Sequence, residues 1–414
     1  MDPVTIHPRG IDAYAASAGE EALAELRRLA EPLAGKRVLH VNATPVGGGV
    51  AEILQSAIPL LCDLGLDAEW RTIRAEPIFF EVTKMMHNAL QGAPHPFTTG
   101  EQAIYRETQQ QIAEGLRHDY DVVVVHDPQP AGLLQAAGRN SARWIWRLHI
   151  DSSRPHPPAW ALLRQFLDGY DALVFTMAEF APKDLPQDKV RVSAPAIDPL
   201  LPKNRPIPLA DALATVERIG LDPRRPLVTQ VARLDPWKDP NGVIDAYRTV
   251  RKKVPGLQLA LLGVIAARDD PEAYRVADEV RHHAGHDPEI HIYVDPEEIG
   301  QPEVGAVQQM AAVVFNKSLK EGFGLSVTEA LWKATPVIGG RVGGIPLQLQ
   351  DHVGGFLVSS VDEAAERTQW LLDNPPAARE IAARGRAHIR KEFLITRFLA
   401  DELKLYAEVL EKVG

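Results

Sequence analysis

The residues from Lys320 to Glu329 combine two glycines with two carboxylates that lie eight positions apart. An apolar run at 311–315, typical of a buried strand, precedes them, and a segment with helical spacing follows. A glycine turn in that position presents backbone N–H groups at a helix N-terminus, where the helix dipole favours an anion. Glu321 and Glu329 would then accept hydrogen bonds from hydroxyl groups. Phosphate on amides and hydroxyls on carboxylates indicate a nucleotide sugar, although a capped helix with two solvated acids also fits this stretch.

A second group of charged residues follows the predicted strand at 226–234. Arg233 and Lys238 leave the end of that strand together. The planar guanidinium of an arginine binds two phosphate oxygens, and a lysine adds a point charge. A diphosphate leaving group needs such neutralisation, so the pair supports a nucleotide-sugar ligand. The alternative is that Arg233 and Lys238 are ordinary surface residues that bind no ligand.

In the N-terminal half, two predicted strands end in a histidine and an aspartate. His126 and Asp127 close one apolar run, and His149 and Asp151 close the next. The carboxyl ends of strands are where open α/β sheets bind ligands. Two such pairs at equivalent strand ends therefore indicate a site.

Two weaker features lie nearby. Gly47–Gly49 separates a predicted strand from a helix and suits a phosphate or a close sugar, but it lacks the spacing of either a P-loop or a dinucleotide fingerprint. The predicted helix at 77–92 carries Glu81, Lys84, His87 and Asn88 on one polar arc. A solvated helix face explains that arc equally well.

Strands and helices alternate along most of the chain, which predicts parallel sheets covered by helices. After an irregular arm and a helix at 20–33, the predicted strands lie at 36–42, 67–73, 121–127, 144–151, 171–176 and 190–195, and then at 226–234, 257–264, 290–295, 312–317, 336–340 and 355–358. Five prolines between 195 and 208 predict a connection between two domains. A last amphipathic helix is expected at 393–413.

The composition bounds the class of protein. The 414 residues are 45% hydrophobic and 24% charged, which favours two globular domains. The net charge of −10 argues against a nucleic-acid partner. No signal pattern or long apolar run is present, so the default location is the cytoplasm, away from membranes. The single cysteine, Cys62, is most simply a core residue.

Other chemistries are less well supported. His282, His283 and His286 lack an acidic or cysteine partner for a metal, and they are expected to end a surface helix. A G-x-S-x-G turn, as hydrolases use, is absent from the sequence.

These motifs resemble those of a known family. Glu321 to Glu329 matches the E-x7-E element of retaining glycosyltransferases with the GT-B fold, the group that includes glycogen and sucrose synthases. Arg233 and Lys238 match that group's Arg-x4-Lys pair, and Gly47–Gly49 matches its N-terminal glycine loop. Four N-terminal segments resemble more closely the trehalose glycosyltransferring synthases and the retaining trehalose phosphorylases; they are 79–84, 87–92, 126–130 and 149–151. The likeness runs from about residue 36 to the C-terminus.

The resemblance implies an α/β fold of two Rossmann-like, doubly wound domains that face each other across a cleft. The N-terminal, acceptor-binding domain would cover 1–200, with the helix at about 395–414 packing back on it. The nucleotide-sugar domain would cover 209–394, and 195–208 would connect the two.

The resemblance also implies roles for individual residues. Arg233 and Lys238 would bind the diphosphate, Glu321 the donor glucose and Glu329 the ribose. The full set comprises, for catalysis, Arg233, Lys238, Glu321, His149 and Asp151; for the donor, Gly48, Gly49, Gly324, Leu325, Ser326 and Glu329; and for the acceptor, Glu81, Lys84, Asn88, Asp127 and Gln129.

The implied reaction transfers glucose from a nucleoside-diphosphate glucose to glucose, reversibly and with retention, and yields trehalose. We expect front-face transfer, with double displacement through Glu321 as the open alternative. A retaining trehalose phosphorylase and, further away, a nucleotide-sugar epimerase also remain open. No essential cofactor is expected, and any Mg²⁺ would come with the nucleotide rather than on protein ligands. The expected partners are small molecules, and a homodimer stays open.

Overall fold

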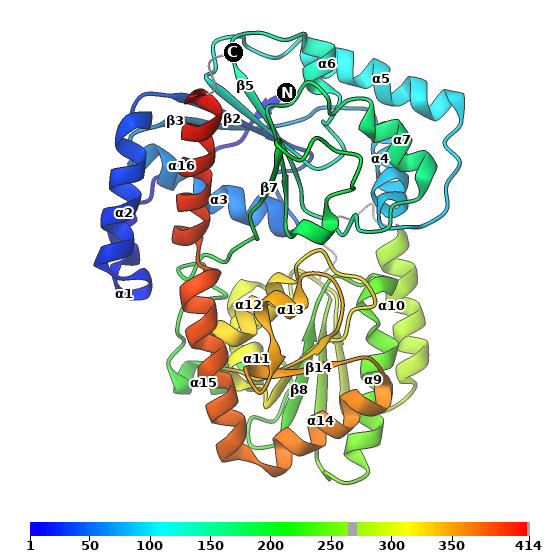
Figure 1. The fold of residues 1–414 in the computed structure, drawn as a ribbon. Helices are drawn as coiled ribbons and strands as arrows, with labels where there is room; N and C mark the ends of the chain where they lie inside the picture. The colour runs from blue at the N-terminus through cyan, green and yellow to red at the C-terminus, as the bar shows by residue number, and fades with distance from the viewer. Residues whose placement is uncertain (264–270, 412–414) are drawn as a thin grey trace. The chain divides into compact units, whose positions relative to one another are not determined.

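The computed structural model describes residues 1–263 and 271–411, which form two compact units. Unit 1 contains Met1–Ala196 and the segment that starts at Ile395, and unit 2 contains Ile197–Leu394. Each unit is built on one seven-stranded sheet with helices around it (Figure 1). The predicted class, two doubly wound α/β domains, is confirmed.

The sheet of unit 1 has the order β1-β3-β2-β4-β5-β6-β7, and only the edge pair β1–β3 is antiparallel. Its strands are β1 (Asp2–Pro3), β2 (Arg37–Asn42), β3 (Asp67–Thr72), β4 (Val122–His126), β5 (Arg143–Leu148), β6 (Ala172–Phe175) and β7 (Val190–Val192). Its helices are η1 (Ile11–Tyr14), α1 (Ala15–Ala18), α2 (Glu20–Ala30), η2 (Glu31–Leu33), α3 (Gly49–Asp63), α4 (Pro77–Leu90), α5 (Thr99–Ala113), α6 (Leu133–Ala137), α7 (Pro157–Arg164), η3 (Ala178–Phe180) and α16 (Ile395–Glu411).

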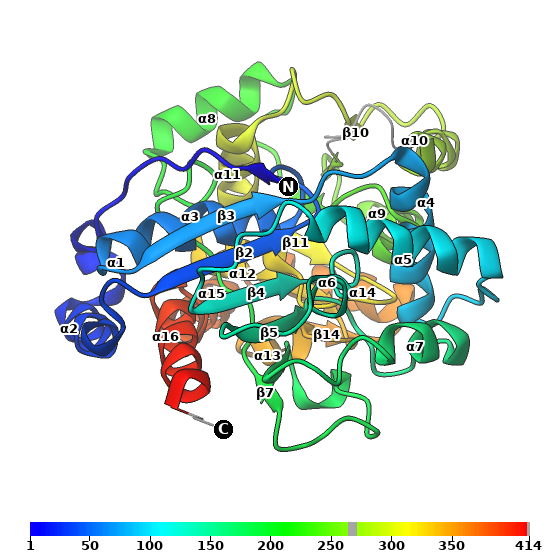
Figure 2. The same ribbon diagram turned by 90° about the horizontal axis from the view of Figure 1, so that it is seen from above.

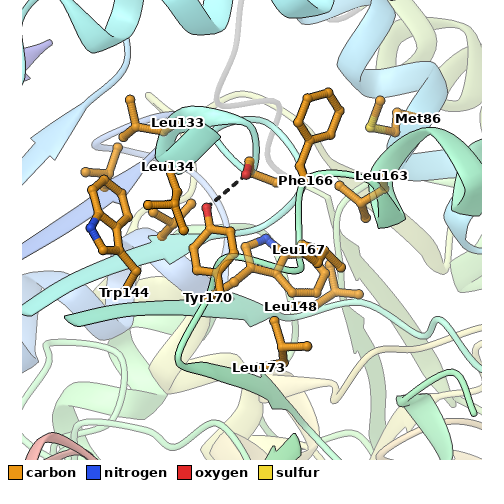
Figure 3. Close-up of a cluster of buried hydrophobic side chains, with 14 of the residues drawn as sticks. Met86, Leu133, Leu134, Trp144, Leu148, Leu163, Phe166, Leu167, Tyr170 and Leu173 are labelled. Atoms are coloured by element: carbon orange, nitrogen blue, oxygen red, sulfur yellow. Dashed lines mark hydrogen bonds between the residues drawn. The ribbon is translucent and has the colours of Figure 1, made fainter. Parts of the chain in front are cut away.

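The two faces of this sheet carry different side chains, because successive residues of a strand point to opposite faces. On one face, apolar residues of β2, β4 and β5 join the core with helices α4 to α7, where Met86, Leu133 and Leu163 are buried (Figure 3). Within that core, the Tyr170 hydroxyl donates to the carbonyl oxygen of Ala131 at 2.9 Å.

The other side of unit 1 includes the last helix of the chain. Helix α16 packs against α2 and α3, which lie more than 300 positions earlier in the sequence (Figures 1 and 2). Leu399, Leu403 and Tyr406 are among its buried residues. The last helix therefore completes a unit that the first half of the chain begins.

The sheet of unit 2 is parallel throughout, with the order β10-β9-β8-β11-β12-β14-β13. Its strands are β8 (Leu227–Val231), β9 (Gln258–Leu262), β10 (Ile290–Tyr293), β11 (Val313–Asn316), β12 (Val337–Gly340), β13 (Gln350–Asp351) and β14 (Gly354–Val358). Its helices are α8 (Leu209–Arg218), η4 (Pro236–Lys238), α9 (Pro240–Arg251), α10 (Pro271–Ala284), α11 (Gln301–Met310), α12 (Leu325–Trp332), α13 (Ile345–Gln348), α14 (Val361–Asp373) and α15 (Pro375–Glu392).

All twelve predicted strands are present, and two were missed. Strands β1 and β13 are two residues long, too short to show the alternation that identifies a strand. The prediction that Cys62 belongs to the core is wrong. Cys62 is exposed, because it lies in the last turn of α3, beyond the residues that pack on the sheet.

The chain connects the two units at two points, Ala196–Ile197 and Leu394–Ile395. On each side of these points, hydrogen bonds within one unit join the two connecting segments. In unit 2, the Ile197 N–H donates to the Phe393 carbonyl oxygen at 2.9 Å. In unit 1, the Arg397 guanidinium donates to the carbonyl oxygens of Ala194 and Pro195, at 2.8 and 3.0 Å. Most of the proline-rich segment belongs to unit 2.

Across 1–263 and 271–411, every helix is too short or too polar to cross a membrane.

Candidate active site

The candidate residues of unit 2 lie where three adjacent strands, β8, β11 and β12, end. Arg233 and Lys238 follow β8, the glycine turn follows β11, and Gly343–Gly344 follows β12. Because parallel strands share one carboxyl edge, the sheet brings these loops together. They are the part of unit 2 in which the sequence predicted a donor site.

The glycine turn after β11 has the predicted form. Gly324 is the N-cap of α12 with φ of 87°, and Leu325 and Ser326 open the helix. The first N–H groups of a helix have no intrahelical acceptor, so this turn can bind an anion. The Asn316 amide donates to the Ser326 hydroxyl at 3.0 Å and ties the turn to the end of β11.

Glu321 and Lys238 form an ion pair in this structure. Lys238 Nζ donates to Glu321 Oε2 at 2.6 Å, and Ser318 Oγ lies 3.2 Å from the same oxygen. Glu321 is buried, whereas the Arg233 side chain is 63% exposed and lies 3.6 Å from Asp235. The structure therefore orients Lys238 and leaves Arg233 at the surface of unit 2.

Gly343 and Gly344 pack against the backbone of the glycine turn. A Cβ atom on Gly343 would lie 1.6 Å from the Glu321 carbonyl oxygen, and φ of 52° at Gly343 disfavours a side chain in any case. A Cβ on Gly344 would lie 2.7 Å from the Gly322 carbonyl oxygen. The resemblance did not include these two glycines, although a Gly-Gly pair directly after a predicted strand was a visible signal.

Glu329 is buried on α12 and paired with lysine. Its Oε1 accepts from Lys203 Nζ at 2.6 Å, and its Oε2 lies 3.4 Å from Gln308 Nε2. Lys333, one turn further along, donates to the Gln308 side chain at 3.0 Å, and burial lowers the pKa of Lys333 to about 8. The proposed ribose contact of Glu329 stays a prediction, and a ribose would share this carboxylate with Lys203.

In unit 1, the glycine loop and two strand ends lie at the carboxyl edge of the sheet. Gly48 is the N-cap of α3 with φ of 91°, and Gly49 is the first residue of that helix. The loop before α3 is exposed as far as Gly48. This arrangement leaves helix N–H groups accessible, as the prediction for Gly48 and Gly49 requires.

Asp127 and His149 contact each other at the ends of β4 and β5. The Asp127 carboxylate accepts the backbone N–H of His149 at 3.0 Å, and Asp127 has a left-handed backbone with φ of 65°. Burial raises the pKa of Asp127 to about 7, against the opposing effect of that hydrogen bond. A carboxyl group with a near-neutral pKa, held in a strained conformation, is typical of a functional site.

Two other predicted residues of these loops have local structural roles. The Asp151 carboxylate accepts from the N–H and the hydroxyl of Ser153, at 2.9 and 2.6 Å. The Gln129 carbonyl oxygen accepts from Gln109 at 2.7 Å, and Gln129 Oε1 is a buried atom without a hydrogen-bond partner among the described residues.

The three candidates on α4 differ in exposure. Glu81 and Lys84 are exposed, and Asn88 is half-buried one turn later. Their assignment to the acceptor stays a prediction.

The sequence prediction missed a row of buried polar residues beside His149. His126 Nδ1 lies 3.0 Å from His149 Nε2, and His40 Nδ1 lies 3.0 Å from His126 Nε2. His40 Nε2 lies 3.0 Å from the hydroxyl of Tyr406 on α16, which donates to Glu402 at 2.8 Å. The available signal was Glu402 and Tyr406 themselves, which occupy core-facing positions four apart in an amphipathic helix.

The candidate residues therefore form two sets, one in each unit. The set of unit 1 is Gly48, Gly49, Glu81, Lys84, Asn88, Asp127, Gln129, His149 and Asp151; the set of unit 2 is Arg233, Lys238, Glu321, Gly324, Leu325, Ser326 and Glu329. Among the residues that the structure describes, no three histidine, cysteine or acidic side chains come together as a metal site would require.

Comparisons with protein-family models agree with this division. Residues 40–182 match the family described as "Trehalose synthase, N-terminal domain", and residues 214–388 match "Glycosyl transferases group 1".

Individual proteins are similar over most of the chain. A trehalose synthase from Rubrobacter xylanophilus is 46% identical over 395 residues, covering 94% of each chain. A trehalose phosphorylase from Grifola frondosa is 29% identical over 88% of this chain and only 56% of its own length. Among solved structures, sucrose-phosphate synthase from Thermosynechococcus elongatus superposes with a TM-score of 0.71 at 18% identity, covering 91% of this chain and 99% of that one. That likeness concerns the fold alone.

Proposed function

Because the chain belongs to the trehalose synthase family of group 1 glycosyltransferases, we propose that it makes trehalose from a nucleoside-diphosphate glucose and glucose, reversibly and with retention. The observation that carries this proposal is the 46% identity to a trehalose synthase over 94% of both chains. The trehalose phosphorylase is more distant and extends well beyond the matched region. Trehalose synthesis is therefore favoured over phosphorolysis.

We assign the donor to unit 2. The N–H groups at Leu325 and Ser326 and the cations Arg233 and Lys238 would bind the diphosphate. The oriented Lys238 is suited to charge that develops on the leaving oxygen, since a donor already in place needs no reorganisation. Glu321 would contact the donor glucose through the carboxylate oxygen that does not accept from Lys238.

The reaction we propose is front-face transfer. The bond between C1 of the donor glucose and the phosphate oxygen breaks through an oxocarbenium-like state, while Arg233 and Lys238 stabilise the charge on the diphosphate. The anomeric hydroxyl of the acceptor glucose attacks C1 from the same face, and its proton passes to the departing phosphate. His149 and Asp127 would bind sugar hydroxyls from unit 1.

The cofactor, partner and location assignments remain part of the proposal. We expect full activity without a protein-held metal ion, and substrates that are small molecules. The location we propose is the cytoplasm, where nucleotide sugars are made.

The first experiment separates the candidate reactions. The protein is incubated with ADP-, UDP- or GDP-glucose, with and without glucose, and separately with trehalose and inorganic phosphate. We expect trehalose only when both nucleotide sugar and glucose are present, and reversal by the nucleoside diphosphate. Glucose 1-phosphate from trehalose and phosphate, without a response to any nucleoside diphosphate, would establish a phosphorylase instead. A free monosaccharide formed without glucose would establish an epimerase.

Glu329 tests the donor assignment within the synthase reaction. We expect Glu329→Gln to raise the KM for the donor by about tenfold, the loss of one charged hydrogen bond, and to leave the KM for glucose unchanged. Lys203→Gln is the matched control, because it breaks the same ion pair and keeps the carboxylate. If both variants raise the donor KM equally, Glu329 acts through the ion pair rather than through a ribose.

A further inference from the structure

Three histidines, two of them buried and the third half-buried, cross the sheet of unit 1 in one row. The register pairs His40 of β2 with Val124 and His126 of β4 with Arg147 of β5. Since alternate residues of a strand share a face, His40, His126 and His149 lie on the same face of the sheet. Neighbouring rings lie edge to edge and nearly parallel, with centroids 5.3 Å apart and planes 20–22° apart. The nitrogens face each other at 3.0 Å, so each contact needs one N–H and one lone pair.

The direction of these hydrogen bonds is fixed at one end, on α16. Glu402 forms a buried ion pair with Arg147, so its carboxylate can only accept. The Tyr406 hydroxyl must therefore donate its proton to Glu402, at 2.8 Å. A tyrosine has a single hydroxyl proton, so its oxygen can only accept from His40, which must carry a proton on Nε2.

When each histidine is neutral, the proton on His40 Nε2 fixes the direction of the remaining hydrogen bonds in the row. His40 Nδ1 is then a lone pair that accepts from His126 Nε2–H, and His126 Nδ1 accepts from His149 Nε2–H. His149 is left with a lone pair on Nδ1. The structure shows no hydrogen-bond partner for that atom in 1–263 and 271–411, and His149 is half-buried at the end of the row.

The surroundings keep the three rings neutral. Burial, assisted by the positive charge of Arg147, lowers the pKa of His40 and of His149 to about 3. Burial and the neighbouring rings lower the pKa of His126 well below its usual value, and burial keeps Tyr406 protonated by raising its pKa. Arg147 contributes beyond its ion pair, because its Nε and Nη1 have no hydrogen-bond partner among the described residues and its charge stays close to the rings.

We propose that Glu402 and Tyr406 fix the tautomer of His149, so that Nδ1 of His149 is a permanent hydrogen-bond acceptor for a sugar hydroxyl. This role rests on the proposed function, in which His149 contacts the reacting sugar. Glu402, Tyr406, His40 and His126 are then positioning residues, and His149 is the residue that touches substrate. The row makes His149 an acceptor and not a donor.

An acceptor of this kind aligns a hydroxyl without removing its proton. A ring with so low a pKa does not hold a proton at neutral pH, so the hydroxyl keeps its own proton until the phosphate takes it. His149 Nδ1 thus accepts a hydrogen bond from a group that donates, and every glucose hydroxyl can donate. It orients that hydroxyl in one direction.

The tautomers can be read directly by ¹⁵N NMR of protein labelled at histidine. We expect His40, His126 and His149 each to show a protonated Nε2 and an unprotonated Nδ1, with no titration between pH 5 and 8. A protonated Nδ1 on His149 would overturn the proposal. This measurement needs no turnover, so it tests the tautomer of His149 even if the protein does not make trehalose. The trehalose assay in turn tests the proposed function whichever tautomer His149 has.

Tyr406→Phe tests the control that α16 exerts. Without the hydroxyl, His40 has no acceptor, both directions of the row become accessible, and Nδ1 of His149 gains a proton in part of the molecules. The kcat should then fall in proportion to the fraction of molecules whose His149 Nδ1 carries a proton, about twofold when the two tautomers are equally populated. Tyr170→Phe is the matched control, because it removes another buried hydroxyl of unit 1, one that donates to Ala131 (Figure 3). It should change neither the tautomers nor kcat.

A double variant shows whether the effect passes through His149. His149→Asn places an amide oxygen near the position of Nδ1 and does not depend on the row. Adding Tyr406→Phe to His149→Asn should cause no further loss of kcat if the coupling is real. The proposal would be contradicted if Tyr406→Phe lowered kcat as much in the His149→Asn protein as in the wild type. It would also be contradicted if His149 kept a single Nε2–H tautomer in the Tyr406→Phe protein.

Discussion

At the scale of single residues, Arg233 and Lys238 differ in burial and in how firmly each side chain is held. Lys238 is half-buried and already bonded to Glu321 at 2.6 Å, whereas Arg233 is largely exposed. A ligand that binds Lys238 meets an ammonium group that Glu321 already orients, and a ligand that binds Arg233 must order an exposed side chain. Arg233 contributes little to the stability of the free protein because its side chain is 63% exposed, whereas Lys238 compensates the charge of the buried Glu321.

Replacement of either cation by alanine should therefore impair catalysis without unfolding. We expect kcat/KM to fall by 10²- to 10³-fold for Arg233→Ala and for Lys238→Ala, which corresponds to about 2.7–4 kcal/mol for one preorganised donor. Thermal unfolding of Arg233→Ala should stay within a few degrees of the wild type, whereas Lys238→Ala should lower the Tm further because it leaves the buried Glu321 carboxylate unpaired. Arg224→Ala, which removes an 87% exposed arginine elsewhere in unit 2, is the control. Normal kcat/KM in the first two variants would exclude them from the diphosphate site.

At the scale of elements, the glycine turn after β11 depends on the loop after β12. Gly343 lies so close to the Glu321 carbonyl oxygen that any side chain would displace one of the two loops. The carboxylate of Glu321 is therefore positioned by a residue that has no functional group of its own.

Gly343→Ala should move Glu321 and reduce kcat/KM by roughly a hundredfold, the cost of a displacement of about 1 Å at a reacting centre. Gly220→Ala is the control in the same unit, because Gly220 also has a positive φ, of 91°, but nothing lies within 4 Å of the added Cβ. Gly220→Ala should lose about 1 kcal/mol of stability from backbone strain, and Gly343→Ala should lose more, because its Cβ also meets the Glu321 carbonyl oxygen. Equal activities of the two would mean that the contact with Glu321 is unimportant.

The sequence predicted elements better than it predicted long-range partners. Apolar runs and glycine turns are local signals, so the strands and the turn before α12 could be found in advance. The pairing of Arg147 with Glu402 joins residues 255 positions apart, and no periodicity tells which distant helix covers a given face of a sheet. The deep burial of Glu329 against Lys203 was unpredictable for the same reason.

At the scale of the whole molecule, unit 1 contains ionisable groups that make its stability depend on pH. His40, His126 and His149 have lowered pKa values, so as the pH falls through 6.5 the unfolded chain takes up protons that the folded unit does not, about three of them by pH 5.5. Asp127 acts in the opposite direction, because its raised pKa makes the folded unit bind one proton more between pH 3.8 and 7. Their net effect is a loss of about two protons on folding, so stability falls as the pH falls.

We expect the free energy of unfolding of unit 1 to fall by about 3 kcal/mol per pH unit between about pH 5.5 and 4, from two protons at 1.36 kcal/mol each. Hydrogen exchange at pH 7 and pH 5, after correction for intrinsic rates, should show protection lost in β2, β4 and β5 before it is lost in β8, β11 and β12. The strands of unit 2 serve as the internal control. Equal loss in both units would mean that the buried histidines titrate normally.

The position of α16 also has a consequence for the order in which the protein is made. A ribosome finishes all 198 residues of Ile197–Leu394 before α16 emerges. At about 5–20 residues per second, this takes roughly 10–40 s. During that time the nascent first unit has Arg147 without Glu402, and His40 without Tyr406. Unit 2 is contiguous and can be finished first, so the half of the enzyme translated first is the half completed last.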